Sequence, residues 1–288
     1  MDINILLCIF FSSGLFVILR LFARYKVDNF QGIVINYFTA AGFSLFSNLG
    51  HNLDHIHECL GFFHITLLVG FLFIVVFMLT AKVTQAYGVG VSSVASKLSM
   101  VIPITLGLFL YNEGMALPKI AGLILALVAV VVVNIQEKNS VSAKNALLLP
   151  VILFIGCGLV DSSIKFTQHH FISDSNRQLF IMCTFGSAGL IGIAKLVYDL
   201  AVLKKPFIRN SWFGGLALGA CNYYSLFFFI RSFETDGAES SRVFALVNLG
   251  VVVLCTVWAV VLFREKINRY KMTGIILSIA AILTLFFA

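Results

Sequence analysis

Charged side chains are scarce in this chain of 288 residues. They make up 11% of it, whereas 60% of the residues are hydrophobic and the mean hydropathy is +1.00. Soluble proteins carry about a quarter charged residues, so this composition excludes an ordinary water-soluble fold. A helix that crosses a membrane needs about 20 mostly apolar residues. The sequence therefore predicts an all-α integral membrane protein with short loops.

Motifs for catalysis and for tight metal binding are also missing. The sequence contains no HExxH, no Walker loop, no GxSxG and no CxxC. Most of its cysteines fall inside apolar runs, which is typical of small packing residues and not of a disulfide framework: Cys8, Cys157, Cys183, Cys221 and Cys255. We expect neither an enzyme nor a resident metal or cofactor.

The basic residues exceed the acidic ones, giving a formal net charge of +7. In a soluble protein this surplus would favour nucleic acid as a partner. Here the basic residues lie in short loops between apolar runs, where they set membrane orientation instead. The expected partners are the lipid bilayer and a small-molecule substrate, with no nucleic acid.

Ten apolar segments are separated by polar or charged breaks. They cover residues 3–19, 30–47, 61–80, 88–111, 117–135, 146–167, 178–198, 211–232, 239–263 and 270–287. We expect each to form a membrane-crossing helix, because an open sheet or a loop facing lipid would leave backbone groups without hydrogen-bond partners.

The two halves of the chain repeat one another. When residues 83–133 are laid over 235–285, Glu113, Lys119 and Gly122 fall on Glu265, Lys271 and Gly274. This predicts a first repeat over 1–136, a linker over 137–145 and a second repeat over 146–288. Each repeat has five helices, an odd number, so the second copy is inverted with respect to the first.

The loop charges predict an orientation. Most lysines and arginines follow odd-numbered segments, which places those loops in the cytoplasm and both chain ends outside. At equivalent positions of the repeat, Asn112 and Gly114 are replaced by Arg264 and Lys266. This is the difference expected when two copies of one motif face opposite compartments.

Two segments carry a family resemblance. Residues 83–129 combine a small-residue-rich helix, a proline, an Asn-Glu turn and a glycine-containing helix. Residues 239–281 repeat this pattern, with Arg-Glu at the turn and without the proline. The chain thus resembles the drug/metabolite transporter superfamily in its ten-helix EamA-type form. The resemblance implies two inverted five-helix repeats around a central cavity, a bacterial inner membrane location and transport of metabolites. The resemblance does not determine whether the protein forms a homodimer. Many members of the superfamily have both chain ends in the cytoplasm. Either this chain is inverted in the membrane relative to them, or our assignment of its loops is displaced by one helix.

Lys97 is the leading candidate for substrate contact. It lies near the middle of segment 88–111, on one helix face with Ser93 and Ser96. An ammonium on a serine-lined wall is suited to a carboxylate or a phosphate. The alternative is an internal ion pair that holds helices together.

Other polar side chains at membrane depth complete the candidate site. Asp161 lies one turn before Lys165, so the two can neutralise each other, or Asp161 can pair with Lys97 or carry a coupling proton. Asn222, Tyr223 and Asn248 can bind a ligand through hydrogen bonds, or can join helices by the same bonds.

Small residues and proline predict local packing. Gly215 and Gly219 form a GxxxG pair, and Gly122 with Ala126 is echoed by Gly274 with Ser278, so these helices should approach closely. Pro103 should kink the segment that holds Lys97.

The favoured function is therefore a secondary transporter, and more specifically an exporter, of a small organic metabolite such as an amino acid or organic anion, by alternating access. The alternative is a divalent metal transporter or a metal-responsive membrane protein. It would use the histidine-rich loops assigned to the outside, the first of which contains His51, His55 and His57.

Overall fold

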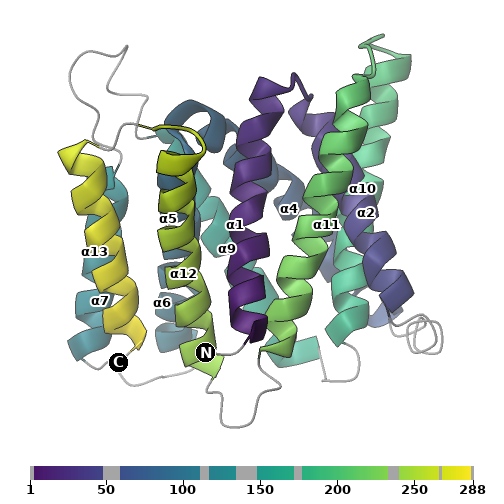
Figure 1. Ribbon diagram of the computed structural model, residues 1–288. Helices are drawn as coiled ribbons and strands as arrows, with labels where there is room; N and C mark the ends of the chain where they lie inside the picture. Colours follow the sequence, from purple (N-terminus) through teal and green to yellow (C-terminus); the bar gives the residue numbers. More distant parts are fainter. Residues whose placement is uncertain are drawn as a thin grey trace. The chain divides into compact units, whose positions relative to one another are not determined.

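The computed structural model describes residues 3–47, 59–110, 117–133, 148–171, 177–232, 240–265 and 268–286. Within these ranges the regular structure is entirely α-helical (Figure 1). The helices are α1 (Ile3–Arg24), α2 (Asn29–Ser47), α4 (Cys59–Tyr87), α5 (Val89–Leu98), α6 (Val101–Leu110), α7 (Leu117–Val133), α9 (Leu148–Phe171), α10 (Arg177–Ala201), α11 (Arg209–Arg231), α12 (Ser240–Val261) and α13 (Arg269–Phe286). The predicted all-α class is confirmed.

Four helical stretches are long and apolar enough to cross a membrane by their length and hydropathy. They are Ile3–Arg24, Gly61–Tyr87, Val89–Leu106 and Leu179–Ala201. A stretch of about 20 apolar residues matches the thickness of the hydrocarbon core. These four stretches indicate a membrane location.

The segment predicted over 88–111 is broken into two helices. Helix α5 ends at Leu98 and α6 begins at Val101. Pro103 explains the break, because it has no N–H to donate and its ring would clash with the carbonyl of Ser99. The Ser99 carbonyl instead accepts from the Ile102 N–H at 2.9 Å. The predicted proline kink is thus a two-residue interruption.

The chain forms two compact units. Unit 1 contains residues 1–20, 79–159 and 224–288, and unit 2 contains residues 21–78 and 160–223. Each unit draws on both halves of the sequence. The spatial division therefore differs from the predicted sequence repeats, 1–136 and 146–288, which stay a prediction.

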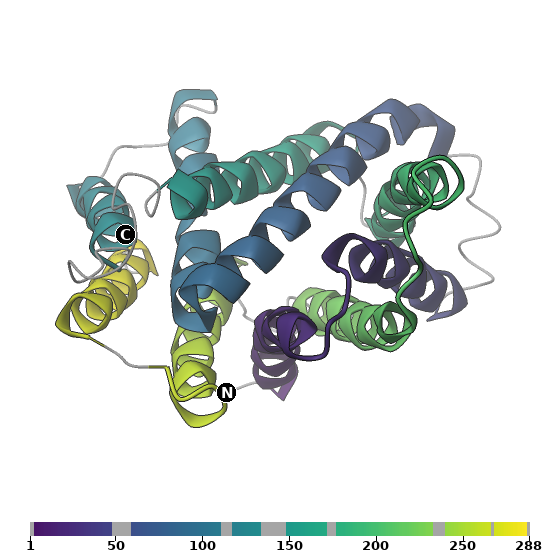
Figure 2. The same cartoon turned by 90° about the horizontal axis from the view of Figure 1, so that it is seen from above.

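In unit 1, α7 and α13 pack side by side along small residues (Figure 2). Gly122, Ala126 and Ala129 of α7 are buried, whereas its Ile124 and Leu127 are exposed. On α13 the same pattern holds, with these buried small residues: Gly274, Ser278 and Ala281. Small side chains let helix backbones approach, while large ones face outward, as expected for helices in lipid.

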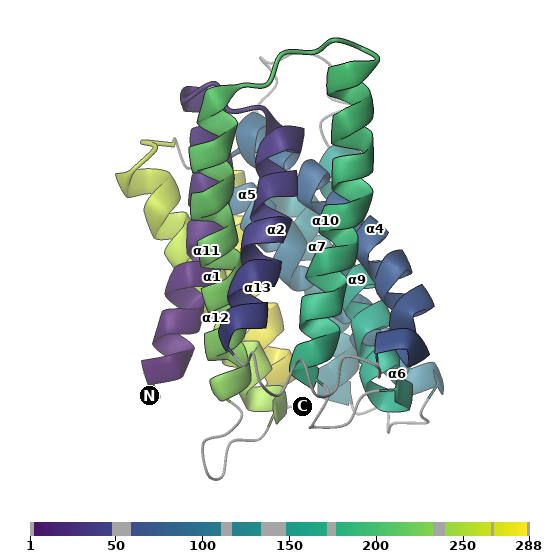
Figure 3. The same ribbon diagram turned by 90° about the vertical axis from the view of Figure 1, so that its right-hand side faces the viewer.

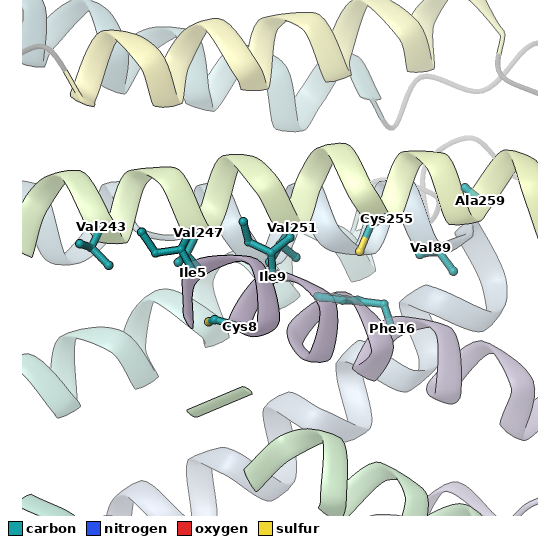
Figure 4. Packing of buried hydrophobic residues seen from close by; sticks show 10 residues of the cluster. All are labelled: Ile5, Cys8, Ile9, Phe16, Val89, Val243, Val247, Val251, Cys255 and Ala259. Carbon is teal, nitrogen blue, oxygen red and sulfur yellow. The ribbon is translucent and has the colours of Figure 1, made fainter. Parts of the chain in front are cut away.

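Helix α1 packs along α12 in the same unit (Figure 4). Ile5 and Ile9 lie against Val247 and Val251, and all four are buried. A Cβ at Gly250 would meet Ile9 Cγ1 at 2.8 Å, so the glycine lets the two helices approach closely. This apolar contact fixes α12, which in turn contacts α5.

Unit 2 is built on α2, which contacts α10 and α11. A Cβ at Gly215 would lie 2.7 Å from the carbonyl oxygen of Gly32, and one at Gly219 would lie 2.7 Å from that of Asn36. Both glycines of the predicted GxxxG pair therefore allow backbone contact between α11 and α2. The predicted close approach is confirmed for this pair.

Three helix ends carry a basic residue in the left-handed backbone conformation. Lys26 follows α1 with φ 53°, Lys204 follows α10 with φ 50°, and Arg264 follows α12 with φ 50°. Just beyond them the chain turns back, and the N–H groups of Val27 and Lys205 donate to carbonyls of the last helical turns. Glycine is the usual residue at such positions, because a Cβ disfavours this conformation.

Candidate functional site

Lys97 lies in the last turn of α5 and is half-buried, as is Ser96 beside it. Ser92, Ser93 and Ser99 are fully buried inside the structure. The polar stripe predicted along this helix is therefore accessible over a single turn. Ser96 and Lys97 are its accessible members.

Most hydroxyl groups of the stripe are already engaged. Ser93 donates to the Gly90 carbonyl at 2.9 Å, and Ser99 donates to the Ser96 carbonyl at 2.6 Å. Ser92 accepts a hydrogen bond from Thr84 at 2.8 Å. Serines at membrane depth commonly bond back to their own helix, which removes a donor from any ligand. This arrangement favours Ser96 over Ser93 for ligand contact.

The Ser96 hydroxyl has a weak neighbour. It accepts from the Cys157 thiol of α9 at 3.4 Å. A thiol is a poor donor, so the lone pairs and the proton of this hydroxyl remain available to a better partner. Ser96 is thus the hydroxyl best placed to act together with Lys97.

Asn248 of α12 faces the break between α5 and α6. It is 5% exposed, and its Nδ2 donates to the Met100 sulfur at 3.3 Å. A thioether is a weak acceptor, so this amide is only partly satisfied. The structure therefore brings Asn248 beside the break that follows Lys97.

Lys97 has no charged partner among the described residues of unit 1. Within the part of the chain that the structure describes, it forms no hydrogen bond or ion pair. The helical segments of unit 1 contain no Asp or Glu at all. An ionisable side chain at membrane depth is by default a hypothesis for a functional site.

Glu265 holds the start of the helix that carries Lys97. The Val89 N–H donates to Glu265 Oε1 at 3.1 Å, so this carboxylate caps the N-terminus of α5. Gly88, with φ +99°, lies directly against the same carboxylate, where a Cβ would clash. An anion at a helix N-terminus is stabilised by the helix dipole and the free N–H groups.

Cations hold the other side of the same junction. Arg20 donates to the Thr84 carbonyl at 3.0 Å and also to that of Gln85, and Lys271 donates to the Tyr87 carbonyl at 3.5 Å. These are the last carbonyls of α4, where positive charge is favourable. Sequence reasoning missed this junction. Its signal was Gly88 between two apolar helices, together with a glutamate that recurs in the repeat.

The remaining predicted residues, Asp161, Asn222 and Tyr223, belong to unit 2. Asn222 Nδ2 donates to Asn36 Oδ1 at 3.1 Å, which joins α11 to α2. The Tyr223 ring stacks on Phe43 at a centroid distance of 5.5 Å. Asp161 is half-buried and has polar partners of its own. Its pairing with Lys97 stays a prediction.

Among the described side chains of unit 2, two buried polar atoms have no hydrogen-bond partner: Asn36 Nδ2 and the Tyr37 hydroxyl. The Tyr37 ring packs against three phenylalanines, Phe73, Phe77 and Phe185, with centroids 5.6 to 6.2 Å away. The Tyr37 side chain is therefore enclosed by aromatic rings.

The metal hypothesis falls mostly outside the described residues. His51, His55 and His57 lie in the segment 48–58, which the structure does not describe. Among the described side chains, no group of three or more histidine, cysteine or acidic residues could hold a metal ion.

One prediction about the cysteines is wrong. Cys183, near the start of α10, is disulfide-bonded, whereas Cys8, Cys157, Cys221 and Cys255 are free thiols. It packs beside Phe62, Leu179 and Phe180. Apolar surroundings indicated a packing role, but they do not distinguish a thiol from a disulfide, because both are readily buried.

Comparison with known proteins supports the fold and leaves the activity open. No family model matches the chain. A protein of Haemophilus influenzae, described as uncharacterized, is 27% identical over 99% of this chain and 97% of its own length. A solved structure titled "Crystal structure of protein" superposes with a TM-score of 0.60, at 13% identity, over 96% of this chain and 95% of that one. At this identity the likeness shows a shared fold alone.

Proposed function

We propose that this protein is a secondary transporter of small organic anions, amino acids included, that works by alternating access of two inverted five-helix repeats. The observation that carries the proposal is Lys97. A half-buried ammonium, in a unit whose helices contain no carboxylate, needs an anion from elsewhere. A carboxylate or phosphate group of a substrate would supply it, with Ser96 and Asn248 as neighbouring hydrogen-bonding groups.

The helix interruption beside Lys97 supports the same proposal. Between Leu98 and Val101 the helix is interrupted, and Asn248 lies at this point on the neighbouring helix. In many transporters, interrupted helices mark the substrate site, because unwound backbone exposes polar groups there. Export fits the resemblance to EamA-type permeases, whose substrates are metabolites.

The pairing of α7 with α13 supports the inverted repeat. Gly122, Ala126 and Ala129 correspond to Gly274, Ser278 and Ala281 in the sequence repeat, and both sets are buried where these two helices pack. Helices related by an inverted repeat are expected to meet near the pseudo-symmetry axis. The N-terminal end of α1 and the C-terminal end of α13 also lie at one end of unit 1, as an even number of crossings requires (Figure 1).

The disulfide at Cys183 supports an external position for the start of α10. The charge pattern places the loop before this helix outside the cytoplasm. Disulfides persist in oxidising compartments such as the bacterial periplasm and are rare in the cytosol. Two independent features therefore favour the same orientation, with both chain ends outside.

Lys97→Ala should abolish transport while leaving expression and membrane insertion intact. A thermal-shift screen of the purified protein against amino acids, organic acids, nucleosides and sugars would first identify a ligand, since binding raises the melting temperature. Uptake into proteoliposomes then compares Lys97→Ala with Lys97→Arg, and with Lys195→Ala on the surface of unit 2. We expect an anionic ligand whose transport is lost only in the first variant. A neutral ligand moved equally well by Lys97→Ala would overturn the proposal.

Orientation is tested separately by cysteine labelling in whole cells. An impermeant maleimide added from outside should label a cysteine introduced at position 54 and spare one at position 205. The reverse pattern would place both chain ends in the cytoplasm. It would leave the role of Lys97 unaffected, so the two tests are independent.

A further inference from the structure

Two connections of unit 2 form a basic surface, which we define by Lys26, Lys204, Lys205 and Arg209. Lys26 lies between α1 and α2, Lys204 and Lys205 lie between α10 and α11, and Arg209 begins α11. All four side chains are exposed. The two connections occur at the same end of the unit (Figure 3).

Hydrogen bonds hold these connections together. Gln31 links them twice, because its Nε2 donates to the Pro206 carbonyl at 3.0 Å and its Oε1 accepts from the Ile208 N–H at 2.8 Å. Asn210 Nδ2 also donates to the Tyr25 carbonyl at 2.8 Å. The basic surface is therefore a built feature of unit 2, with its lysines fixed on a common frame.

The backbone at two of the lysines is unfavourable for any residue with a Cβ. Lys26 and Lys204 both adopt positive φ at helix ends, where glycine is easier to accommodate. A lysine at such a position gains some stabilisation from the helix dipole, but glycine would relieve the backbone strain. The presence of lysine and not glycine at both positions indicates that positive charge has a function on this surface.

Acidic groups neutralise only part of this surface, at Lys205. Asp199 is engaged by Lys195 at 2.7 Å and by Lys205 at 3.4 Å, and Asp28 accepts from the Gln31 N–H. Across the described ranges of the chain, the side chains of Lys26, Lys204 and Arg209 form no ion pair or hydrogen bond. The surface thus has positive charge available for an external anion.

Apolar side chains are interleaved with the basic ones. Tyr25 is 58% exposed, Phe207 45% and Trp212 52%, and Val202 and Leu203 are exposed beside them. A soluble phosphate or an acidic protein would leave this apolar surface in water. The headgroup region of a bilayer suits both kinds of group, since aromatic rings and basic side chains gather there.

We propose that the basic surface binds the headgroup phosphate of an anionic phospholipid, such as phosphatidylglycerol. Its aromatic and aliphatic side chains enter the interface beside that headgroup. The proposal rests on the membrane location and does not depend on transport. Each lysine near an anionic membrane surface contributes about fivefold in binding.

Trp212 provides a local probe, since the chain has only two tryptophans and the other is Trp258 of α12. In a Trp258→Phe background, Trp212 fluorescence is measured in vesicles of brominated phosphatidylglycerol or brominated phosphatidylcholine. We expect stronger quenching by the anionic lipid. Lys26→Gln with Lys204→Gln should reduce that preference about 25-fold, at fivefold per charge, while arginine at both positions should keep it.

Three results would overturn the proposal. The first is an unchanged lipid preference in the double glutamine variant. The second is equal preference reported by Trp258 in a Trp212→Phe protein, which would reflect net charge and not this surface. The third is displacement of the brominated anionic lipid by soluble glycerol phosphate, which would make the site one for free phosphates.

A glycine variant separates charge from folding. Lys26→Gly with Lys204→Gly should raise the melting temperature in phosphatidylcholine, because the positive φ is no longer strained, while the preference for phosphatidylglycerol is lost. A variant that is both more stable and less selective cannot be explained by misfolding. A glycine variant that keeps the preference would contradict the proposal.

Discussion

The polar side chains of the two units have different kinds of partner. Unit 1 holds Lys97, and none of its helices contains a carboxylate. The Ser96 hydroxyl beside it bonds to the Cys157 thiol, and Asn248 bonds to the Met100 thioether. Unit 2 holds neutral amides that bond to each other and a tyrosine enclosed by phenylalanine rings. In unit 1 the polar groups around the helix break thus have weak partners, whereas in unit 2 the paired amides join α11 to α2.

The two kinds of polar group also differ in their energetic contribution to the fold. A charged side chain at the bilayer centre costs about 2.5 to 3.5 kcal/mol on insertion scales, which a stable fold rarely retains without a use. Hydrogen bonds between membrane helices contribute about 0.6 to 2 kcal/mol each. The Asn36 and Asn222 pair is of the second kind, and its loss should affect stability before it affects transport.

The largest expected effect is at Gly219 of unit 2. Gly219→Ala places a Cβ 2.7 Å from the Asn36 carbonyl oxygen, a backbone atom that cannot move aside. We expect a loss of about 3 kcal/mol or more in unfolding free energy, measured by denaturant unfolding in detergent. Gly42→Ala on α2 is the matched control, since nothing lies within 4 Å of its added Cβ. Equal losses in both variants would show that unit 2 does not rest on backbone contact.

An intermediate effect is expected at the amide pair. Asn222→Ala leaves Asn36 Oδ1 buried without this donor and should cost about 1 to 3 kcal/mol, whereas replacing both asparagines by leucine should cost less. A double-mutant cycle by thermal unfolding measures the coupling. Transport should persist in the folded variants. Loss of transport at unchanged stability would assign this pair to the ligand and remove the contrast between the units.

The smallest effect is expected on the outer surface of unit 2. Lys205 and Lys195 are each 55% exposed and share Asp199, so Lys205→Gln leaves the closer Lys195 contact in place. We expect a change within about 0.5 kcal/mol, smaller still at high salt. Lys195→Gln serves as the comparison, and its effect should be the larger. A loss of several kcal/mol from Lys205→Gln would mean that this pair is structural.

Periodicity and residue size predicted much of the packing. Hydropathy located a helix within every predicted segment, and four of the described helical stretches are long and apolar enough to cross a membrane. Gly215 and Gly219 predicted a close helix approach, and Pro103 predicted an interruption, since both act through local sterics. These are effects of one residue on its own backbone or its nearest neighbour.

Features that depend on distant partners were not predictable in this way. The serine stripe promised free hydroxyls, but Ser93 and Ser99 bond to their own helix. Glu265 caps α5 from 176 residues away. The left-handed conformation of Lys26 and Lys204 was not predicted either, because glycine is the usual signal for that conformation at the C-terminal end of a helix. Hydropathy says where a helix lies and little about what its polar atoms bond to.

The state of the cysteines makes the chain a convenient host for site-specific labels. Cys8, Cys157 and Cys255 are free but buried, Cys221 is half-buried, and Cys183 is blocked by its disulfide. Thiol reagents should therefore react with a newly introduced exposed cysteine well before these five. Purification without reductant preserves that background, whereas dithiothreitol would open the disulfide and add reactive sulfur near the start of α10.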